Sequence, residues 1–117
     1  MSVPGRRAER LAHQLRNEIA ELMERGLKDP RIGFATVTRV ELTPDLRQAR
    51  VMVSVMGSEE AQAASLEGLS SAAGFIRHEM AQRLRLRFAP ELTFVLDHGP
   101  EDSERIEKLL QKLKDER

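Results

Sequence analysis

The stretch from Ser70 to Leu96 reads SSAAGFIRHEMAQRLRLRFAPELTFVL and contains the features that decide the fold. Gly74 lies among small residues in a helical pattern, and we expect it to separate two helices, because glycine weakens a helix and lets the chain turn. Pro90 lacks an amide hydrogen and is expected to end the second helix. The alternating apolar residues from Leu92 to Leu96 then predict a strand.

The same stretch is rich in arginine. Between Ala72 and Pro90 the only acidic residue is Glu79, and the basic residues are Arg77, Arg83, Arg85 and Arg87. Over the whole chain, 19 basic and 19 acidic residues cancel, although a nucleic-acid-binding domain is usually more basic. Any anionic partner would therefore meet a local basic patch and not a uniformly positive surface.

Apolar periodicity predicts the elements that precede this stretch. A stripe with three- and four-residue spacing predicts a helix from about Gly5 to Leu27. Two strands, Phe34–Leu42 and Gln48–Met56, are joined by a short turn and should form an antiparallel hairpin. The alternation in the first strand is imperfect, which either a bulge or burial on both faces would explain.

The remaining elements complete a single domain. Ser58 is expected to cap a helix rich in small residues, and a last helix is predicted at about residues 101–114. The predicted order is α-β-β-α-α-β-α, with a core over about residues 6–98. A chain of 117 residues suffices for one hydrophobic core, so we expect one domain over residues 1–117.

The sequence offers little that could support catalysis. There is no cysteine, and the three histidines have no zinc-ligand spacing, so no metal or other cofactor is expected. Asp97-His98 lacks a nucleophile motif and is interpreted as a strand end. No apolar run suggests a membrane span or a signal peptide, which favours a cytoplasmic protein. Each of the four phenylalanines falls within an apolar pattern, so base stacking on exposed aromatic rings is not expected.

Several segments of the chain resemble ribosome-binding factor A, a bacterial family of factors for small-subunit maturation. Within the deciding stretch the resemblance rests on Ala72–Arg77, Leu84–Arg87 and Pro90–Phe94. Upstream, Lys28–Gly33 and Val40–Asp45 resemble a loop and a turn of that family. Together with the element order, these segments extend the resemblance over nearly the whole chain.

The resemblance implies an α+β, type II KH-like domain, in which helices back a three-stranded mixed sheet. KH domains that bind single strands clamp the backbone with a Gly-x-x-Gly loop between two helices. The ribosome-binding factor A family has an Ala-x-Gly kink instead, which Ala72, Ala73 and Gly74 would occupy here. This sequence contains no Gly-x-x-Gly, so a surface that docks folded rRNA is the better expectation.

The resemblance also implies a function. Members are non-enzymatic assembly factors that bind the free or immature small ribosomal subunit and its rRNA near the decoding region. They assist late maturation and 5′-end processing of the rRNA and contribute to growth in the cold. We expect this chain to act in the same way, as a monomer without cofactors.

Arginine suits an rRNA contact because its planar fork can engage two phosphate oxygens. The predicted RNA-binding residues are Arg77, Arg83, Arg85 and Arg87, with help from Arg6, Arg10, Lys28 and Arg31. The competing interpretation is that alternating arginine and leucine only solvate an amphipathic segment. A second hypothesis, favoured by the zero net charge, is a protein-binding α/β module without a nucleic-acid role.

Overall fold

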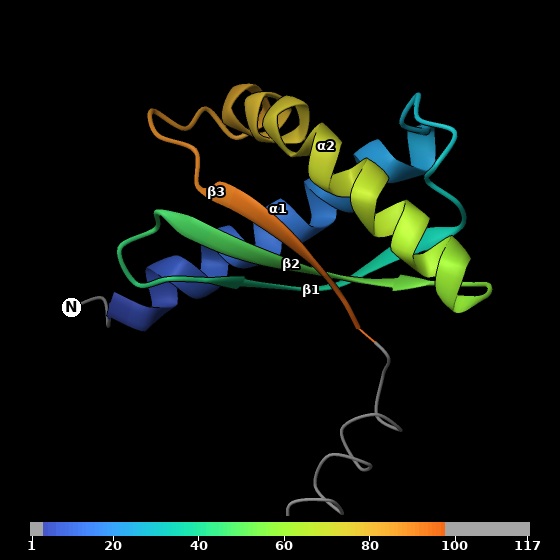
Figure 1. The fold of residues 1–117 in the computed structure, drawn as a ribbon. Coiled ribbons are helices and arrows are strands. Elements are labelled where there is room, and N and C mark those ends of the chain that lie inside the picture. Colours follow the sequence, from blue (N-terminus) through green and yellow to red (C-terminus); the bar gives the residue numbers. More distant parts are fainter. Residues whose placement is uncertain (1–3, 98–117) are drawn as a thin grey trace, which may run out of the picture.

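The computed structural model describes residues 4–97 and places them in two layers, a sheet and a pair of helices (Figure 1). In chain order the elements are α1 (Pro4–Arg25), β1 (Ala35–Leu42), β2 (Gln48–Val55), α2 (Glu59–Arg83) and β3 (Glu91–Leu96). The predicted helix at about residues 101–114 and His98 lie outside the described residues. The α+β class and the three-stranded mixed sheet are confirmed.

The sheet has the strand order β1-β2-β3. β1 and β2 form the predicted antiparallel hairpin, with Val40 opposite Val51, whereas β3 pairs in parallel with β2 and sets Phe94 opposite Val51. The register of β1 shifts between Val37 and Arg39. The imperfect alternation of the first strand is therefore explained by a bulge, one of the two possibilities that the sequence allowed.

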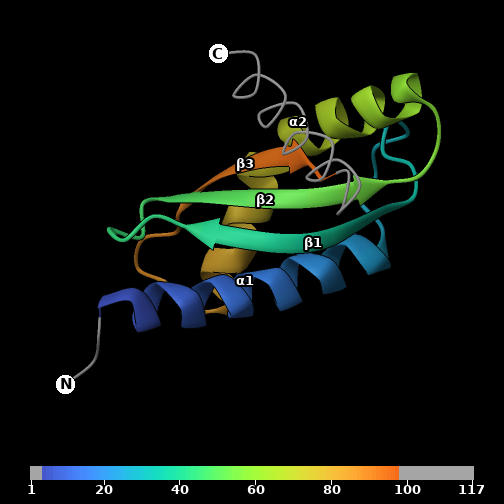
Figure 2. The ribbon, with the colours of Figure 1, turned by 90° about the horizontal axis from the view of Figure 1, so that it is seen from below.

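The core lies between the sheet and the two helices. α1 runs alongside β1 and α2 crosses over β3, both on the same face of the sheet (Figure 2). The apolar stripe predicted for the first helix is confirmed, since Leu15 and Ile19 are fully buried. They share the core with strand residues and with the buried side of α2, represented by Val51, Ile76 and Met80.

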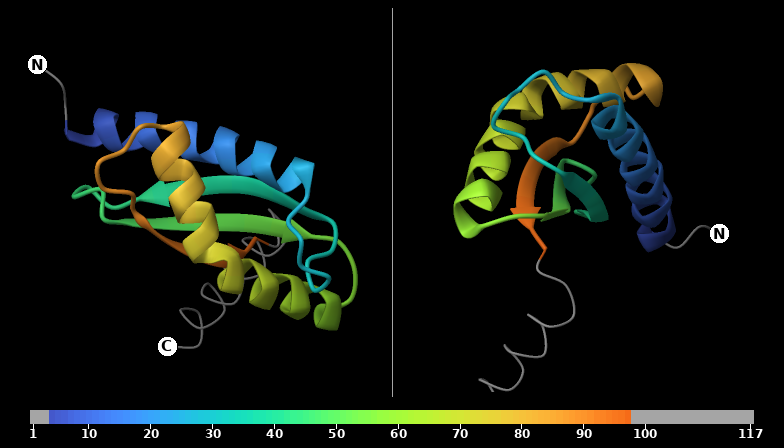
Figure 3. Two further views of the ribbon diagram at one scale, coloured as in Figure 1. Left: turned by 90° about the horizontal axis from the view of Figure 1, so that it is seen from above. Right: turned by 90° about the vertical axis from the view of Figure 1, so that its right-hand side faces the viewer.

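The expectation of two helices separated by Gly74 is wrong, because α2 continues without interruption from Glu59 to Arg83. A glycine costs a helix only about 1 kcal/mol relative to alanine, and the burial of Leu69 and Ile76 on either side of it outweighs that cost. The ribbon of α2 nevertheless changes direction along its length (Figure 3). Attribution of this bend to the Ala-x-Gly motif stays a prediction, as does the type II KH-like assignment.

The start of α2 is confirmed, but its end lies earlier than Pro90. The Ser58 side chain accepts a hydrogen bond from the Ala61 amide, as expected for an N-cap. At the other end, the amide of Leu86 donates to the Ala81 carbonyl at 2.9 Å, while Arg85 has a φ of 51°. This is a Schellman ending, in which a left-handed residue, usually glycine, satisfies the last carbonyls.

Candidate nucleic-acid interface

The structure separates the predicted site residues into groups at opposite ends of the molecule. At one end lie the start of α1, the β1–β2 turn and the α2–β3 loop (residues 84–90), whereas the loop between α1 and β1 lies at the other end (Figures 1 and 2). Arg6, Arg10, Arg85 and Arg87 belong to elements at the first end, and Lys28 and Arg31 belong to the second. A single surface patch that contains all eight residues therefore does not form.

Arg77 holds the α2–β3 loop in place. Its Nε and Nη2 atoms both donate to the Ala89 carbonyl, at 3.1 and 2.8 Å. The guanidinium thus ties the last part of α2 to the residue before the buried Pro90. Within residues 4–97 it has no carboxylate partner, so its positive charge remains uncompensated beside the loop.

Arg85 and Arg87 project from the α2–β3 loop into solvent. Both side chains are exposed, and neither forms an ion pair with another described residue. The guanidinium carbon of Arg87 lies 5.8 Å from the centroid of the Phe88 ring, which is within cation–π range. Unlike those of Arg77 and Arg83, the side chains of these two arginines form no hydrogen bond or ion pair with another described residue.

Arg83 faces inward and is already paired with acids. Its Nη1 lies 3.2 Å from Glu18 of α1, and its Nε lies 3.7 Å from Glu79 one helical turn earlier. All three side chains are mostly shielded from solvent. Arg83 therefore links α2 to α1, and the alternation of arginine and leucine does not present all its charges to one partner.

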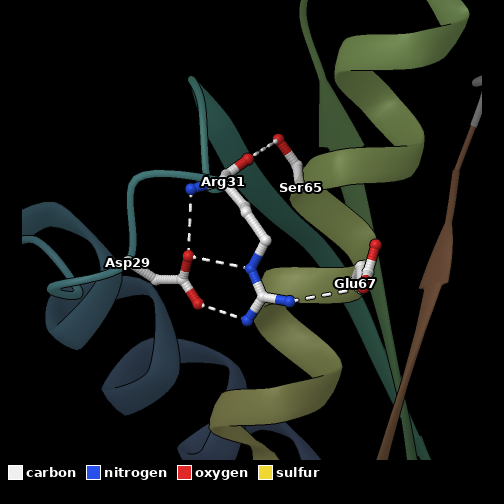
Figure 4. Close-up of polar contacts among 4 residues, drawn as sticks. All are labelled: Asp29, Arg31, Ser65 and Glu67. Atoms are coloured by element: carbon white, nitrogen blue, oxygen red, sulfur yellow. Dashed lines mark hydrogen bonds and ion pairs between the residues drawn. The ribbon is translucent and has the colours of Figure 1, made fainter.

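Arg31 is also occupied within the fold (Figure 4). Its Nε and Nη2 donate to the two carboxylate oxygens of Asp29, at 3.0 and 2.7 Å, and its Nη1 reaches Glu67 of α2 at 3.4 Å. Hydrogen bonds from the Arg31 side chain and backbone amide lower the pKa of Asp29 to about 2. In turn, the Asp29 carboxylate raises the pKa of the Arg31 guanidinium.

The loop that contains Arg31 packs tightly against α2. The Gly33 amide donates to Ser65 Oγ at 2.9 Å, and a Cβ at Gly68 would lie 2.7 Å from Cγ1 of Ile32. Only glycine leaves room for this approach. The small residues of α2 are evident in the sequence, but this contact was not predicted, because the loop and the helix are more than thirty residues apart. The loop Lys28–Gly33, one of the segments that resemble the family, thus has a structural role.

The remaining predicted contacts are exposed cations. Lys28 is exposed and forms no interaction with another described residue. Arg6 and Arg10 lie on the solvent side of α1 and line an open hollow of about 630 Å³ with Glu9, His13 and Gln14. Arg47 was missed: it lies at the end of the β1–β2 turn, where its carbonyl accepts from the Glu91 amide at 2.8 Å. This bond places an additional arginine beside the start of β3.

The expectation that the four phenylalanines, which fall within apolar patterns, leave no exposed aromatic ring is wrong for three of them. Phe94 is 5% exposed, but Phe34, Phe75 and Phe88 are 76%, 54% and 82% exposed. Phe88 directly follows the alternating arginines and leucines, in the loop between α2 and β3. Exposed aromatic rings are therefore available on this surface.

Other classes of site find no support within residues 4–97. No cluster of three or more histidine, cysteine or acidic side chains in this part of the chain could hold a metal ion. Neither described helix is long and apolar enough to cross a membrane. Asp97, part of the motif interpreted as a strand end, accepts a hydrogen bond from Thr38 at 2.6 Å.

Two helices on one face of a three-stranded mixed sheet, with exposed arginines in the loop before the last strand, define a small α+β domain with one cationic end. The family model for ribosome-binding factor A matches residues 7–110. The chain belongs to the ribosome-binding factor A family.

Individual relatives agree with this assignment. Ribosome-binding factor A of Thermomicrobium roseum is 51% identical over 115 residues, which cover 98% of this chain and 89% of the relative. The crystal structure of ribosome-binding factor A from Thermus thermophilus is 32% identical, with a TM-score of 0.65 over 76% of this chain and 94% of that one. A homology model of the Thermus thermophilus factor, fitted into a cryo-EM map of a 30S–RbfA complex, is 32% identical, with a TM-score of 0.63 over 75% of this chain and 92% of that one.

Proposed function

We propose that this protein is a non-enzymatic ribosome assembly factor that binds the free or immature small ribosomal subunit. The observation that carries the proposal is its membership in the ribosome-binding factor A family, of which one similar structure was fitted into a 30S–RbfA complex. The exposed arginines in the α2–β3 loop support it, because a folded ribonucleoprotein presents a dense array of phosphates.

The contact residues that we propose are drawn from the cationic end. Arg85 and Arg87 contact rRNA phosphates directly, and Arg77, Arg6 and Arg10 add to the positive field around them. Arg83 and Arg31 were predicted to share this role, but their guanidinium groups are balanced by carboxylates of the same chain. Their part in binding is to keep α1, α2 and the loop before β1 in position. Lys28, at the opposite end, contributes only if the rRNA surface wraps around the molecule.

The finer parts of the proposal follow the family resemblance. The factor acts in the cytoplasm as a monomer, binds near the decoding region, and assists late maturation and 5′-end processing of the rRNA. It supports growth in the cold, when rRNA folding is slow. The bend of α2 takes the place of a Gly-x-x-Gly clamp, so the surface docks onto folded rRNA instead of clamping the backbone of a single strand between two helices.

Cosedimentation with purified small ribosomal subunits at increasing salt tests the proposal. The wild-type chain should be retained at low salt and lost steeply as salt rises, because phosphate contacts release counterions. In the double variant Arg85→Ala/Arg87→Ala, affinity should fall at least about tenfold and the slope of log affinity against log salt should shrink by about two.

The matched control is Arg25→Ala/Arg39→Ala. These arginines are 69% and 65% exposed at their side chains and pair with Glu21 and Glu41, away from the α2–β3 loop. The control removes the same charge, so its binding should stay close to that of the wild type. The alternative, a protein-binding module, would be favoured if cosedimentation with small subunits did not change with salt. Binding to an isolated ribosomal protein but not to particles would favour it as well.

A further inference from the structure

Phe88 is a large apolar side chain that the fold leaves in solvent. Its ring is 82% exposed, the highest value among the exposed large apolar residues of the described chain. It contributes nothing to the core, which receives Phe94 from the strand that follows. A ring that folding does not bury is available to a partner.

The backbone that carries Phe88 is fixed on both sides. Before it, the Leu86 amide is bonded to the Ala81 carbonyl of α2 at 2.9 Å. After it, the Ala89 carbonyl accepts two hydrogen bonds from Arg77, and Pro90 is fully buried. A ring presented from such a loop loses little conformational freedom when it binds, which favours affinity.

Positive charge surrounds the ring. The guanidinium of Arg87 lies over Phe88 at 5.8 Å, Arg85 precedes it in the same loop, and Arg77 is bonded to the next residue, Ala89. None of these three arginines is paired with a carboxylate of residues 4–97. An aromatic face combined with arginines is the composition that holds an unpaired nucleotide, whose base stacks while its phosphate is neutralised.

We propose that Phe88 stacks on one unpaired base of the small-subunit rRNA, while Arg85 and Arg87 contact the adjoining phosphates. The inference rests on the proposed function and assigns to it a ligand class, a single-stranded nucleotide at the edge of folded rRNA. Arg87 covers one face of the ring, and the base takes the other. Arg77 is a positioning residue that holds the loop through Ala89.

Phe34 provides a matched control within the same chain. It is 76% exposed but lies in the loop before β1, at the opposite end from Phe88. Its surroundings are a hollow of about 410 Å³ lined by α1 and β1 residues, among them Ala20, Met23 and Glu24, without any arginine. An exposed phenylalanine whose hollow contains no cation, and whose nearest arginine in the sequence, Arg31, is paired with Asp29 and Glu67, should not take a nucleotide.

The first experiment measures binding of the full chain to small ribosomal subunits. Phe88→Leu keeps an apolar side chain but removes the aromatic face, so affinity should fall about tenfold. Phe88→Trp should bind as well as the wild type or more tightly, and Phe34→Leu should bind like the wild type. Thermal melting of each variant verifies that it is folded. The melting temperatures should match that of the wild type, because an exposed ring contributes little to stability.

The second experiment uses Phe88→Trp as a reporter, since the chain has no other tryptophan and no tyrosine. Titration with a ten-nucleotide oligoadenylate should quench its emission through stacking. Titration with inorganic polyphosphate, which has charge but no base, should leave the emission nearly unchanged. A Phe34→Trp chain should respond to neither probe.

The outcomes separate the stacking inference from the proposed function. If the wild type binds particles and Phe88→Leu binds equally well, stacking is refuted while the assembly role stands. If Phe88→Leu binds weakly but oligoadenylate does not quench the reporter, the ring contributes to binding without stacking on a base, and the inference is again wrong. If the wild type does not bind particles, the proposed function itself fails.

Discussion

Arg85 adopts a backbone conformation that arginine rarely takes. Its φ of 51° lies in the left-handed region, where an L side chain costs about 1–2 kcal/mol, and the Schellman ending of α2 requires this conformation. Glycine would fit the position without strain. Leu46 in the β1–β2 turn has a similar φ of 62°, so the strain alone does not assign a function, and we treat a binding role of the Arg85 guanidinium as a prediction.

The pair Arg85→Gly and Arg85→Ala tests both the strain and the binding role. Both variants lose the guanidinium, and both should bind small subunits more weakly than the wild type. Only glycine relieves the backbone, so Arg85→Gly should melt about 4 °C higher than Arg85→Ala. Equal melting temperatures of the two variants would show that the backbone at this position is not strained.

Asp29 makes part of the stability dependent on pH. Its pKa of about 2 lies below the ordinary 3.8 because Arg31 donates to its carboxylate. A carboxyl group with a lowered pKa in the folded state stabilises the fold fully above the ordinary pKa. This contribution is lost as pH falls from about 4 towards 2, when the carboxylate is protonated.

The variant Asp29→Asn should therefore melt at a lower temperature than the wild type at pH 7, and the difference should shrink between pH 4 and pH 2. Melting curves followed by circular dichroism over this range would measure it. Glu24→Gln is the control, since Glu24 is exposed and has no interaction with another described residue. A difference between Asp29→Asn and the wild type that is constant with pH would contradict the assigned role.

At the scale of the elements, α2 contains two glycines with opposite environments. A Cβ at Gly68 would overlap Ile32 at 2.7 Å, whereas a Cβ at Gly74 would meet nothing within 4 Å. The first glycine allows the loop before β1 to lie against the helix. The second occupies open space on an exposed part of the helix, where alanine is sterically acceptable.

Substitution of each glycine by alanine should therefore change stability in opposite directions. Gly68→Ala should destabilise the protein by about 1–3 kcal/mol, because Ile32 must be displaced. Gly74→Ala should stabilise it by about 0.5–1 kcal/mol through helix propensity. Urea unfolding of the two variants gives both values, and a destabilised Gly74→Ala would instead support a hinge that depends on glycine.

The elements themselves could largely be predicted from the sequence, because periodicity is a local property. The stripe of α1, the hairpin and β3 are examples, with Leu15, Val51 and Phe94 buried as expected. The continuity of α2 through Gly74 could not be predicted, since it depends on core contacts made on both sides of that residue. The local sequence shows that glycine lowers helix propensity at this position. It does not show that the burial of Leu69 and Ile76 compensates for the loss.

The candidate site was predicted less completely for a similar reason. Arg31 and Arg83 look like available cations in the sequence, although Asp29 and Glu79 lie only two and four positions from them. Their second partners, Glu67 and Glu18, lie 36 and 65 positions away and become neighbours only in the fold. In the folded protein the charges of these two arginines are paired with carboxylates, so they are less available to an anionic partner. The fold also exposes Phe88, although the sequence places this residue within an apolar pattern.

At the scale of the whole molecule, the net charge is zero but the charges are unevenly distributed between its two ends. The α2–β3 loop presents arginines without carboxylate partners among residues 4–97, whereas in the loop before β1 Arg31 is paired with Asp29 and Glu67. The salt dependence expected for particle binding therefore comes from one end of the molecule. A partner would be oriented as well as attracted, because Lys28 is the only one of the predicted contacts at the opposite end whose charge is not paired with a carboxylate of residues 4–97.

The parallel pairing of β3 with β2 also has a consequence for biosynthesis. As the polypeptide leaves the ribosomal exit tunnel, the hairpin appears early, but the second edge of β2 stays open until all of α2 and then β3 have been translated. The loop that presents Phe88 gains its anchor only at that moment, because Pro90 and β3 fix its far side. A nascent copy therefore cannot present Phe88 from an anchored loop before β3 has been translated.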